Sequence, residues 1–389
     1  MVIALALACR PRLLIADEPT TGLDVTTQKA VMELVVELTR ERGMSTILIT
    51  HDLGLAAAYA DRVVVMEKGH IVETAPSATI FRAPKHPYTR RLMRATPRPG
   101  VALRDLLPDD AAVPPMPSPG TDAKVDAAPL LSVEGLVKTY QTRTKATLVD
   151  KLLRRPIDPG AFNAVDGISF AIRRGESVGL VGESGCGKST TSMMVMRLME
   201  ATAGSIRFDG VDIGAIPAKT FAASPLRPRI QMVFQDPTDS LNPRFTAARA
   251  IADPLLRFAA DKSAAAVRAR CEELATNVGL PLELLDCFPH QLSGGQKARV
   301  GIARAIALNP DLVILDEPTA ALDVSVQAVV LNLLQDLKDR LGMSSLFVSH
   351  DLQVVRLLCD RVIVMKGGRI LEEGATAKVL SAPETDYTR

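Results

Sequence analysis

Residues 176–200 join an apolar run, a glycine-rich loop and a helical run, and this arrangement constrains the fold more than any other stretch. The loop reads GESGCGKS over residues 182–189 and fits the pattern G-x-x-x-x-G-K-[ST]. The run 176–182 before it predicts a strand, and the run 189–200 after it predicts a helix. Glycines let successive backbone N–H groups point at one anion, and the helix adds its positive N-terminal end. The stretch therefore predicts a phosphate-binding loop in an α/β fold.

Each position of this loop is a predicted nucleotide-binding residue. Lys188 would reach the β- and γ-phosphates of a nucleotide, and the Ser189 hydroxyl would bind Mg²⁺. The competing interpretation is a glycine-rich turn with an exposed lysine, which the flanking strand and helix argue against. The full predicted set is Gly182, Glu183, Ser184, Gly185, Cys186, Gly187, Lys188, Ser189 and Thr190.

Residues 1–90 repeat residues 300–389 without a gap. The segment LLIADEPTTGLDVTTQ at 13–28 matches LVILDEPTAALDVSVQ at 312–327, and ITHDL at 49–53 matches VSHDL at 348–352. Asp17 corresponds to Asp316 in this alignment, and the offset is constant. The first copy has no phosphate loop, so we expect its front half to be absent from this chain. A fragment, a misassigned start codon and a truncated gene would each explain that.

The repeat predicts a domain organisation. Residues 1–96 are the C-terminal part of a first domain, 97–129 are a linker with eight prolines and no packed core, and 130–389 are a second domain, slightly truncated at its C-terminus. Buried strands are predicted at 312–315 and 346–349, and a helix at 324–342 ending at Gly342. Strands that alternate with helices predict a parallel sheet, with an inserted helical subdomain at about 240–300. Residues 1–9 are expected to form a buried helix, because they lack the charged start of a signal peptide.

Two carboxylates follow the predicted strand LVIL. Asp316 would hold Mg²⁺ through water, and Glu317 would orient and deprotonate an attacking water. Most such pairs are surface charges, but a phosphate loop on the same sheet favours the catalytic interpretation. A second amide array is predicted at QLSGGQKAR (291–299), where Ser293 would add a donor; the alternative is that Ser293 is an ordinary helix N-cap.

Together these motifs resemble the nucleotide-binding subunits of ABC transporters, whose P-loop NTPase fold carries an inserted helical subdomain. The phosphate loop, LSGGQ, LVILDE, AALD and VSHD occur in the family's order. The resemblance implies that LSGGQ caps the γ-phosphate of an ATP held by another ATPase domain. It also implies that Gln235 senses Mg²⁺ and contacts a membrane partner, that His350 lies at the γ-phosphate, and that Tyr140 stacks on adenine. The signature and following-loop residues carried over are Ser293, Gly294, Gly295, Gln296 and Asp323.

The segments FQDPTDSLNPR (234–244) and HPYTR (86–90) resemble the ATPases of oligopeptide and dipeptide importers, including a fused, glutathione-type form. This implies a peripheral ATPase on the cytoplasmic face of the inner membrane. Its partners would be membrane-spanning permease subunits and, indirectly, a solute-binding protein. In the first copy Asp17, Glu18, Asp24 and His51 remain without their loop. We therefore expect hydrolysis to require a second ATPase domain in trans, for example in a homodimer.

Composition narrows the alternatives. Lys and Arg total 46 against 44 Asp and Glu, and Trp is absent, so nothing indicates a nucleic-acid partner. Five scattered cysteines form no CxxC pair, which favours reduced thiols. Two rival classes have the same motifs: a fused ABC protein acting on ribosomes, which needs a long charged connector, and a DNA-repair ATPase, which needs long coiled coils. A nucleotide-binding remnant without transport activity stays open.

Overall fold

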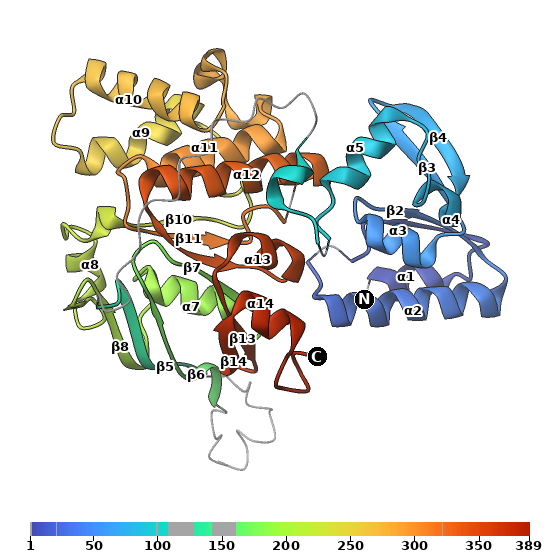
Figure 1. Cartoon of the computed structure of the whole chain (residues 1–389), viewed down its shortest axis with the longest axis horizontal. Coiled ribbons are helices and arrows are strands. Elements are labelled where there is room, and N and C mark those ends of the chain that lie inside the picture. The colour runs from blue at the N-terminus through green and yellow to red at the C-terminus, as the bar shows by residue number, and fades with distance from the viewer. Residues whose placement is uncertain (1, 21, 99, 108–127, 142–160, 321) are drawn as a thin grey trace, which may run out of the picture. The chain divides into compact units, whose positions relative to one another are not determined.

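The computed structural model describes residues 2–20, 22–98, 100–107, 128–141, 161–320 and 322–389 (Figure 1). The chain divides into two compact units, Met1–Pro115 with Ala321–Leu334 and Met116–Ala320 with Gln335–Arg389. This division differs from the boundaries expected from the repeat, which stay a prediction. Most of the predicted proline-rich linker lies outside the described residues. No described helix combines the length and hydrophobicity that crossing a bilayer requires.

A six-stranded sheet forms the centre of the second unit, with the order β10-β11-β12-β7-β13-β14. Every neighbouring pair is parallel except β13 with β14. All residues of β11 and β12 are buried, so the predicted buried parallel strands and the α/β class are confirmed. The strands are β7 (Ser177–Gly182), β10 (Ile230–Val233), β11 (Leu312–Asp316), β12 (Ser344–Val348), β13 (Arg361–Lys366) and β14 (Arg369–Ala375).

A second, antiparallel sheet packs on the first, and the sequence patterns did not single it out. Its order is β6-β5-β8-β9. One hydrophobic cluster joins the two sheets through Leu131, Phe208 and Leu180, each less than 1% exposed. The sheet contains β5 (Leu131–Gln141), β6 (Ala161–Ile172), β8 (Ala203–Phe208) and β9 (Val211–Asp212).

Helices fill most of the stretch between β10 and β11, where the sequence predicts a helical subdomain at about 240–300. Hydroxyl side chains begin them, because Thr246, Ser263 and Ser293 each accept a hydrogen bond from a backbone N–H three residues on. They gather at one end of the unit, over the β10 and β11 edge of the sheet (Figure 1). The elements are α9 (Ala247–Phe258), α10 (Ala264–Asn277), η3 (Leu282–Asp286), η4 (Pro289–Gln291) and α11 (Gly294–Ile306).

The helix after the glycine loop is shorter than predicted. It is α7 (Lys188–Val195), whereas the sequence pattern extended it to residue 200. The chain leaves the helix at Met196, and Arg197 adopts a left-handed backbone conformation with φ of 56°. A residue in the left-handed conformation cannot continue a right-handed helix, so residues 198–200 lie outside the helix. The remaining helices of this unit are α8 (Ala218–Phe221), η2 (Arg227–Arg229), α13 (Leu352–Leu358) and α14 (Thr376–Ser381).

The first unit repeats the C-terminal part of the second, element by element. The strand β1 corresponds to β11, β2 to β12, and the pair β3–β4 to β13–β14, with the same bulge after Val65 as after Val364. The helix α2 corresponds to α12 (Val324–Leu341), and Gly43 and Gly342 follow them with φ near 60°. The internal repeat in the sequence is therefore also a repeat in structure. The elements are α1 (Val2–Ala8), β1 (Leu13–Asp17), α2 (Val25–Arg42), β2 (Ser45–Ile49), α3 (Leu53–Tyr59), β3 (Arg62–Glu67), β4 (His70–Pro76), α4 (Ser77–Ile80), α5 (Pro87–Ala95) and η1 (Leu103–Leu106).

The sheet of the first unit is split where the sheet of the second is continuous. In the second unit β7 pairs with both β12 and β13, whereas among the described residues β1–β2 and β3–β4 are separate two-stranded sheets. Ile15 is 61% exposed and Ile47 is 49% exposed, although their counterparts Ile314 and Leu346 are fully buried. The first unit therefore exposes apolar strand residues whose counterparts in the second unit are buried within that unit.

Two expectations about the first unit were wrong. The initial segment does form a helix, α1, but Leu5 is 76% exposed; Leu7 is buried in a small cluster, and Ile3 packs against that cluster while partly exposed. The start of the predicted linker is packed rather than extended: η1 buries Leu106 to 1% exposure, and the Arg94 Nε atom of α5 donates to the Asp105 carbonyl at 2.9 Å. The two consecutive leucines 106 and 107 provide apolar surface that the proline content concealed.

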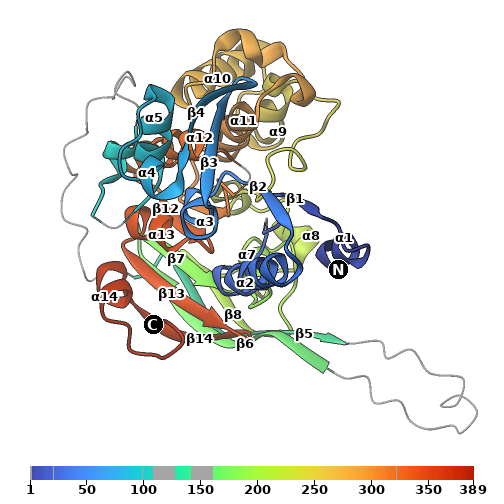
Figure 2. The same cartoon turned by 90° about the vertical axis from the view of Figure 1, so that its right-hand side faces the viewer.

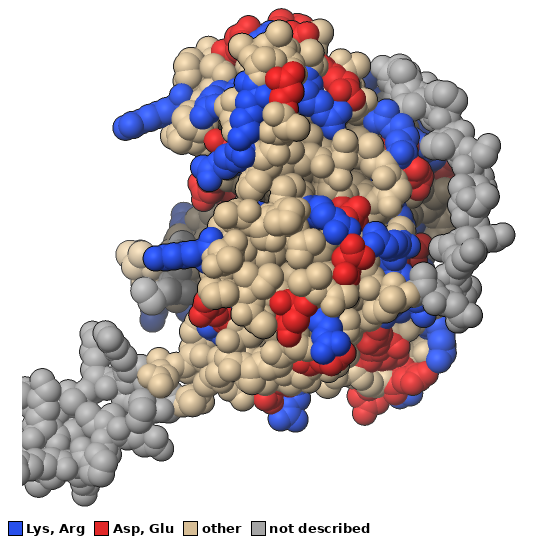
Figure 3. Space-filling view, turned by 90° about the vertical axis from the view of Figure 1, so that its left-hand side faces the viewer, with Lys and Arg blue, Asp and Glu red and all other residues tan. Residues whose placement is uncertain are grey.

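The two views in Figures 1 and 2 place α7 beside the central strands and α10 and α11 at a distance from it. Figure 3 shows Lys and Arg side chains interspersed with Asp and Glu over the face that it presents, with an uncharged zone across the middle. This face gathers no continuous patch of one charge.

Candidate functional site

Two glycines of the loop lie where no other residue fits. Gly187 begins α7 with φ of 108°, and a Cβ atom there would strike the carbonyl oxygen of Ala164. Gly182 ends β7, and a Cβ atom there would strike the carbonyl oxygen of Met365. The Gly368 N–H donates to the Cys186 carbonyl at 3.0 Å, so the loop is held from outside as well. The glycine spacing of the motif therefore follows from close backbone contacts on both sides of the loop.

Lys188 folds back over this loop. Its Nζ atom donates to the Gly182 carbonyl at 2.7 Å and to the Glu183 carbonyl at 2.9 Å, and the residue is 7% exposed. Lys188 is also the first residue of α7, where free backbone N–H groups and the helix dipole favour an anion. Burial raises the pKa of the adjacent Cys186 thiol, which keeps that side chain neutral. The geometry places one cation and a helix N-terminus together, as phosphate binding requires.

Ser189 and Asp316 come together from two elements. The Ser189 hydroxyl at the start of α7 donates to the Asp316 Oδ1 atom at the end of β11, at 3.3 Å. Asp316 is 4% exposed, and this burial raises the pKa of its carboxyl. A buried carboxylate beside a hydroxyl is a pair of oxygen ligands of the kind that Mg²⁺ prefers. In the described part of the chain, no three His, Cys, Asp or Glu side chains gather as a metal site. The pair would therefore need nucleotide phosphates or water to complete a metal's coordination.

Glu317 lies between two polar side chains, those of Gln235 and His350. Gln235, just after β10, donates through Nε2 to Oε2 at 2.9 Å, and His350, just after β12, places Nδ1 3.2 Å from Oε1. Glu317 itself has a φ of 46°, and its N–H donates to the Val348 carbonyl at 2.9 Å. Burial alone would raise the pKa of Glu317, but hydrogen bonds and charge from His350, with smaller effects of Lys188 and Gln235, lower it overall. The hydrogen bond to Glu317 raises the pKa of His350 against the effect of burial.

The signature segment begins α11. The Ser293 hydroxyl accepts from the Gln296 N–H at 3.3 Å, and the Gln296 side chain accepts from the Ser293 N–H at 2.8 Å. This reciprocal pair is a capping box, so the N-cap interpretation of Ser293 describes its local geometry. Gly294 and Gly295 follow as the first turn of α11, which is labelled well apart from α7 in both ribbon views (Figures 1 and 2). A role of these residues on another molecule's nucleotide stays a prediction.

Tyr140 and Asp323 are the two remaining predicted residues. Tyr140, on β5, is 39% exposed; its hydroxyl donates to the Met199 sulfur at 3.1 Å, and the Lys138 Nζ atom lies 5.5 Å from its ring centroid. An exposed ring of this kind could stack on a base, and that role stays a prediction. Asp323 is exposed and directly precedes α12.

The first unit contains a counterpart of the carboxylate–histidine pair. The His51 Nδ1 atom lies 2.8 Å from the Glu18 Oε1 atom, and both side chains are about half exposed. Asp17 ends β1 as Asp316 ends β11, and Asp24 caps α2 by accepting from the Thr27 N–H at 2.9 Å. The 389 residues contain a glycine loop for the second unit alone. The first unit thus has the pair without a loop.

Sequence reasoning missed a residue that touches the phosphate loop. The Glu183 N–H donates to the hydroxyl of Tyr387 at 3.2 Å, across 204 positions of chain. The segment DYTR that contains Tyr387 matches the end of HPYTR in the repeat, and that match was the available signal. Nothing in the segment itself indicates which element it contacts.

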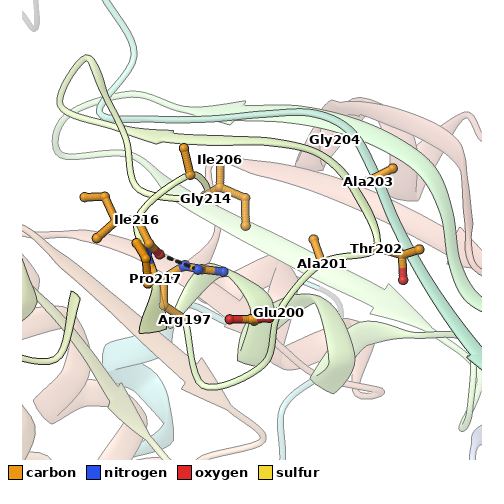
Figure 4. A pocket seen from close by; sticks show the side chains of 11 residues that line it. Arg197, Glu200, Ala201, Thr202, Ala203, Gly204, Ile206, Gly214, Ile216 and Pro217 are labelled. Carbon is orange, nitrogen blue, oxygen red and sulfur yellow. Dashed lines mark hydrogen bonds between the residues drawn. The ribbon is translucent and has the colours of Figure 1, made fainter. Parts of the chain in front are cut away.

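A separate cavity of about 320 Å³ lies at the other end of α7 (Figure 4). Arg197 lines it, is 7% exposed, and donates through Nη2 to the Ile216 carbonyl at 2.6 Å. Glu200 and Thr202 also line the cavity. It contains none of the loop, carboxylate or histidine residues described above, so it is distinct from the candidate nucleotide site.

Two family models match the chain. The model for "ABC transporter" matches residues 165–320, which include the glycine loop, the signature and the two carboxylates. The model for "Oligopeptide/dipeptide transporter, C-terminal region" matches residues 72–119, in the first unit.

Curated relatives match over the whole chain. A glutathione import ATP-binding protein, GsiA, from Pectobacterium atrosepticum is 43% identical, and the match covers 100% of this chain and 62% of that protein. A peptidoglycan transport ATP-binding protein, YejF, from Agrobacterium fabrum is 43% identical, with 66% of it covered. An uncharacterised ABC transporter ATP-binding protein, YejF, from Escherichia coli is 41% identical, with 68% covered. The chain therefore spans about two thirds of the length of these relatives.

A solved structure aligns with the chain as well. The ATP-binding cassette MJ0796, in a dimeric post-hydrolysis state bound to ADP and phosphate, is 29% identical with a TM-score of 0.55. The match covers 63% of this chain and 98% of that one.

Proposed function

Because this chain belongs to the ATP-binding proteins of ABC transporters, we propose that it binds ATP with Mg²⁺ and hydrolyses it to power solute import. The observation that carries the proposal is the meeting of two elements. Lys188 and Ser189 begin α7, Asp316 ends β11 and Glu317 follows it, and a hydrogen bond of 3.3 Å joins Ser189 to Asp316. Phosphate-binding and water-activating groups thus lie side by side.

Binding begins at the loop. The N-terminal N–H groups of α7 receive the phosphates, and the Lys188 ammonium leaves the carbonyls of Gly182 and Glu183 to neutralise them. Exchange of two carbonyl acceptors for phosphate oxygens costs little, because hydrogen bonds between two ions replace hydrogen bonds between the ammonium and neutral carbonyls. Tyr140 stacks on the base.

Ser189, Asp316 and Gln235 are the residues that would hold Mg²⁺. The fit rests on the hydroxyl–carboxylate pair described above. Among the described residues, no cluster of three His, Cys, Asp or Glu side chains could bind a metal by itself, so nucleotide phosphates or water would complete the coordination. When bound, the ion neutralises charge on the β- and γ-phosphates.

Glu317 orients and deprotonates the attacking water. Both of its oxygens are engaged in the structure, one by Gln235 and one by His350. An ionised carboxylate has about four lone-pair sites, so Glu317 can keep both partners and still accept a hydrogen bond from the attacking water. His350, beside Glu317, is the residue that would lie at the γ-phosphate.

A complete site requires a second molecule. The signature residues Ser293 to Gln296 open α11, away from the loop of their own unit, and would cover the phosphates held by a partner domain. The related cassette MJ0796 has a dimeric structure bound to ADP and phosphate, which supports this assignment. Because the 389 residues contain one loop and one signature, two copies of the chain would form two such sites.

The solute is a peptide or a similar small molecule. Support comes from the oligopeptide/dipeptide transporter model at residues 72–119 and from relatives that are a glutathione import and a peptidoglycan transport protein. Membrane-spanning permease subunits would dock near Gln235 and the helices α9 and α10, and a solute-binding protein would supply the cargo. The chain would act at the cytoplasmic face of the membrane as a peripheral subunit.

The test is calorimetry and phosphate release on the purified chain. The parent should bind MgATP and release phosphate, and Lys188→Ala should lose both while unfolding at a similar temperature. A parent that produces no heat with MgATP, or a Lys188→Ala variant that binds as the parent does, would overturn the proposal.

A further inference from the structure

The phosphate loop is held by a residue from the C-terminal segment 382–389. The backbone N–H of Glu183, the second residue of the loop, donates to the Tyr387 hydroxyl at 3.2 Å. The carbonyl of Glu183 accepts from the Lys188 Nζ atom at 2.9 Å. Both polar groups of this residue are therefore engaged, and Tyr387 provides the contact that comes from outside the loop.

Glu372 determines where this segment lies. Its carboxylate, on β14, accepts hydrogen bonds from the Glu384 N–H at 2.9 Å, from the Thr385 N–H at 3.2 Å and from the Thr385 hydroxyl at 3.2 Å. These hydrogen bonds, that from Glu384 first, lower the pKa of Glu372 to about 2. The carboxylate is therefore ionised near neutral pH, the form that accepts these hydrogen bonds.

The ring of Tyr387 has a contact of its own. The Nζ atom of Lys366 lies 4.3 Å from the ring centroid, within the distance at which a cation is attracted by an aromatic face. Lys366 ends β13, directly after Met365, whose carbonyl lies against Gly182. The ring is thus held beside the strand that borders the loop, independently of the hydroxyl.

The same anchor is built a second time. In the first unit, Glu73 on β4 accepts from the N–H groups of Lys85 at 2.9 Å and His86 at 3.0 Å, the counterparts of Glu384 and Thr385. Tyr88 corresponds to Tyr387 in this repeat. The two copies of this anchor indicate that the placement of the segment's backbone is a property of the fold. The contacts of the two tyrosine rings differ, because Glu67 stands at the position of Lys366 and Tyr88 lies in α5.

From these contacts we infer that Tyr387 is a positioning residue for nucleotide binding. Its hydroxyl holds the Glu183 peptide, and through it the first turn of the loop, in the conformation that receives the phosphates. The inference rests on the proposed function and deepens it, because it assigns Tyr387, in the segment that matches HPYTR, a positioning role at the ATP site. The C-terminal segment thereby controls affinity for the nucleotide, while the chemistry stays with Glu317.

The test uses Tyr387→Phe in the full chain, because this variant keeps the ring and its contact with Lys366 and removes only the hydroxyl. We expect the Kd for MgATP, measured by calorimetry, to rise about three- to tenfold, the effect of one hydrogen bond. The turnover at saturating ATP should stay within about twofold, because the catalytic groups are untouched. Tyr88→Phe, the matched substitution in the first unit, should leave both quantities unchanged.

Glu372→Gln supplies a second, independent route to the same result. The variant weakens the anchor without touching the tyrosine, so the Kd should rise in the same direction. Adding Tyr387→Phe to Glu372→Gln should then raise it by less than in the parent, since the hydroxyl is already misplaced. Equal affinity of Tyr387→Phe and the parent, fully additive effects, or an equal loss in Tyr88→Phe would overturn the inference.

Hydrogen exchange in the nucleotide-free chain separates this inference from the proposed function. Peptides that contain the Glu183 amide should exchange faster in Tyr387→Phe than in the parent, and peptides from α9 and α10 should not change. If the parent binds no MgATP, the proposed function fails, whereas the exchange result still decides whether Tyr387 holds the loop. Unchanged exchange at Glu183 would overturn the positioning role by itself.

Discussion

The Nδ1 atom of His350 lies 3.2 Å from the carboxylate of Glu317, directly beyond the ends of two neighbouring parallel strands. The first unit contains the same pair, His51 and Glu18, at 2.8 Å. Of these two pairs, the one formed by His350 and Glu317 belongs to the unit that contains the phosphate loop. The repeat therefore supplies Asp316, Glu317 and His350 with matched controls in the same molecule, at which the same substitution can be made.

The first prediction concerns the carboxylate itself. Glu317→Gln removes the base, so ATP hydrolysis should fall about 10²- to 10⁴-fold, while MgATP binding is retained. Phosphate release and calorimetry measure the two effects. Glu18→Gln should hydrolyse ATP as the parent does; a comparable loss in both variants would contradict the assignment of catalysis to the second unit.

The second prediction is a pH dependence of stability. The raised pKa of His350 means that its ion pair stabilises the folded, nucleotide-free chain fully below the usual histidine value of about 6.5, and that this stability is lost as pH rises through the raised pKa. The lowered pKa of Glu317 means that its contribution is present above its ordinary range and is lost as pH falls through the lowered value. Thermal unfolding should therefore show His350→Gln to be less stable than the parent at about pH 6, with the difference disappearing at alkaline pH.

His51→Gln is the control for that measurement. Its pair is about half exposed, so the substitution should change stability little at any pH. A His350→Gln deficit that grows with rising pH would show that the ion pair is not its source.

The third prediction concerns Mg²⁺. Asp316→Asn removes a buried charge that would hold the ion, so the free Mg²⁺ concentration for half-maximal hydrolysis should rise at least about tenfold. Burial raises the pKa of Asp316, so in the parent the same concentration should rise as pH falls into the range where this carboxyl is protonated. Removal of Mg²⁺ by a chelator should abolish hydrolysis in both proteins. Asp17→Asn, in the first unit, should behave as the parent, and a shifted Mg²⁺ requirement there would argue against the site.

The fourth prediction is that activity depends on pairing of molecules. Turnover per molecule should fall on dilution, because a loop and a signature from different molecules make each site. Lys188→Ala and Ser293→Arg should each be inactive alone, and mixing them should restore part of the activity, since one of the two sites in a mixed pair is intact. Loss of the Ser293 cap costs about 1 kcal/mol, so the thermal unfolding of that variant is checked in parallel. Turnover that stays constant on dilution would overturn the pairing.

Much of the site could be predicted because its residues belong to short motifs with distinctive spacing. The glycine loop, the strand that ends at Asp316 directly before Glu317, and the helix after Ser293 each follow from local patterns that the structure bears out. The family resemblance singled out Gln235 and His350 but did not predict that both contact Glu317, since nothing local indicates which polar residues meet across strands.

The contacts that were missed are long in range or depend on backbone detail. Tyr387 reaches the loop across 204 positions, and no periodicity records such a distance. The helix α7 ends early because one residue, Arg197, takes a left-handed conformation, and the apolar spacing beyond it continues unchanged. The burial of Leu106 was hidden by neighbouring prolines, because composition indicates an average property of a segment and not the fate of a side chain.

The interrupted sheet of the first unit has a practical consequence. The described strands β2 and β3 each pair on one side only, and residues such as Ile15 and Ile47 expose hydrophobic side chains next to those edges. Unpaired strand edges with apolar neighbours are templates for intermolecular β-pairing and aggregation. Concentrated solutions of this polypeptide should therefore tend toward turbidity, and a mild detergent should delay it.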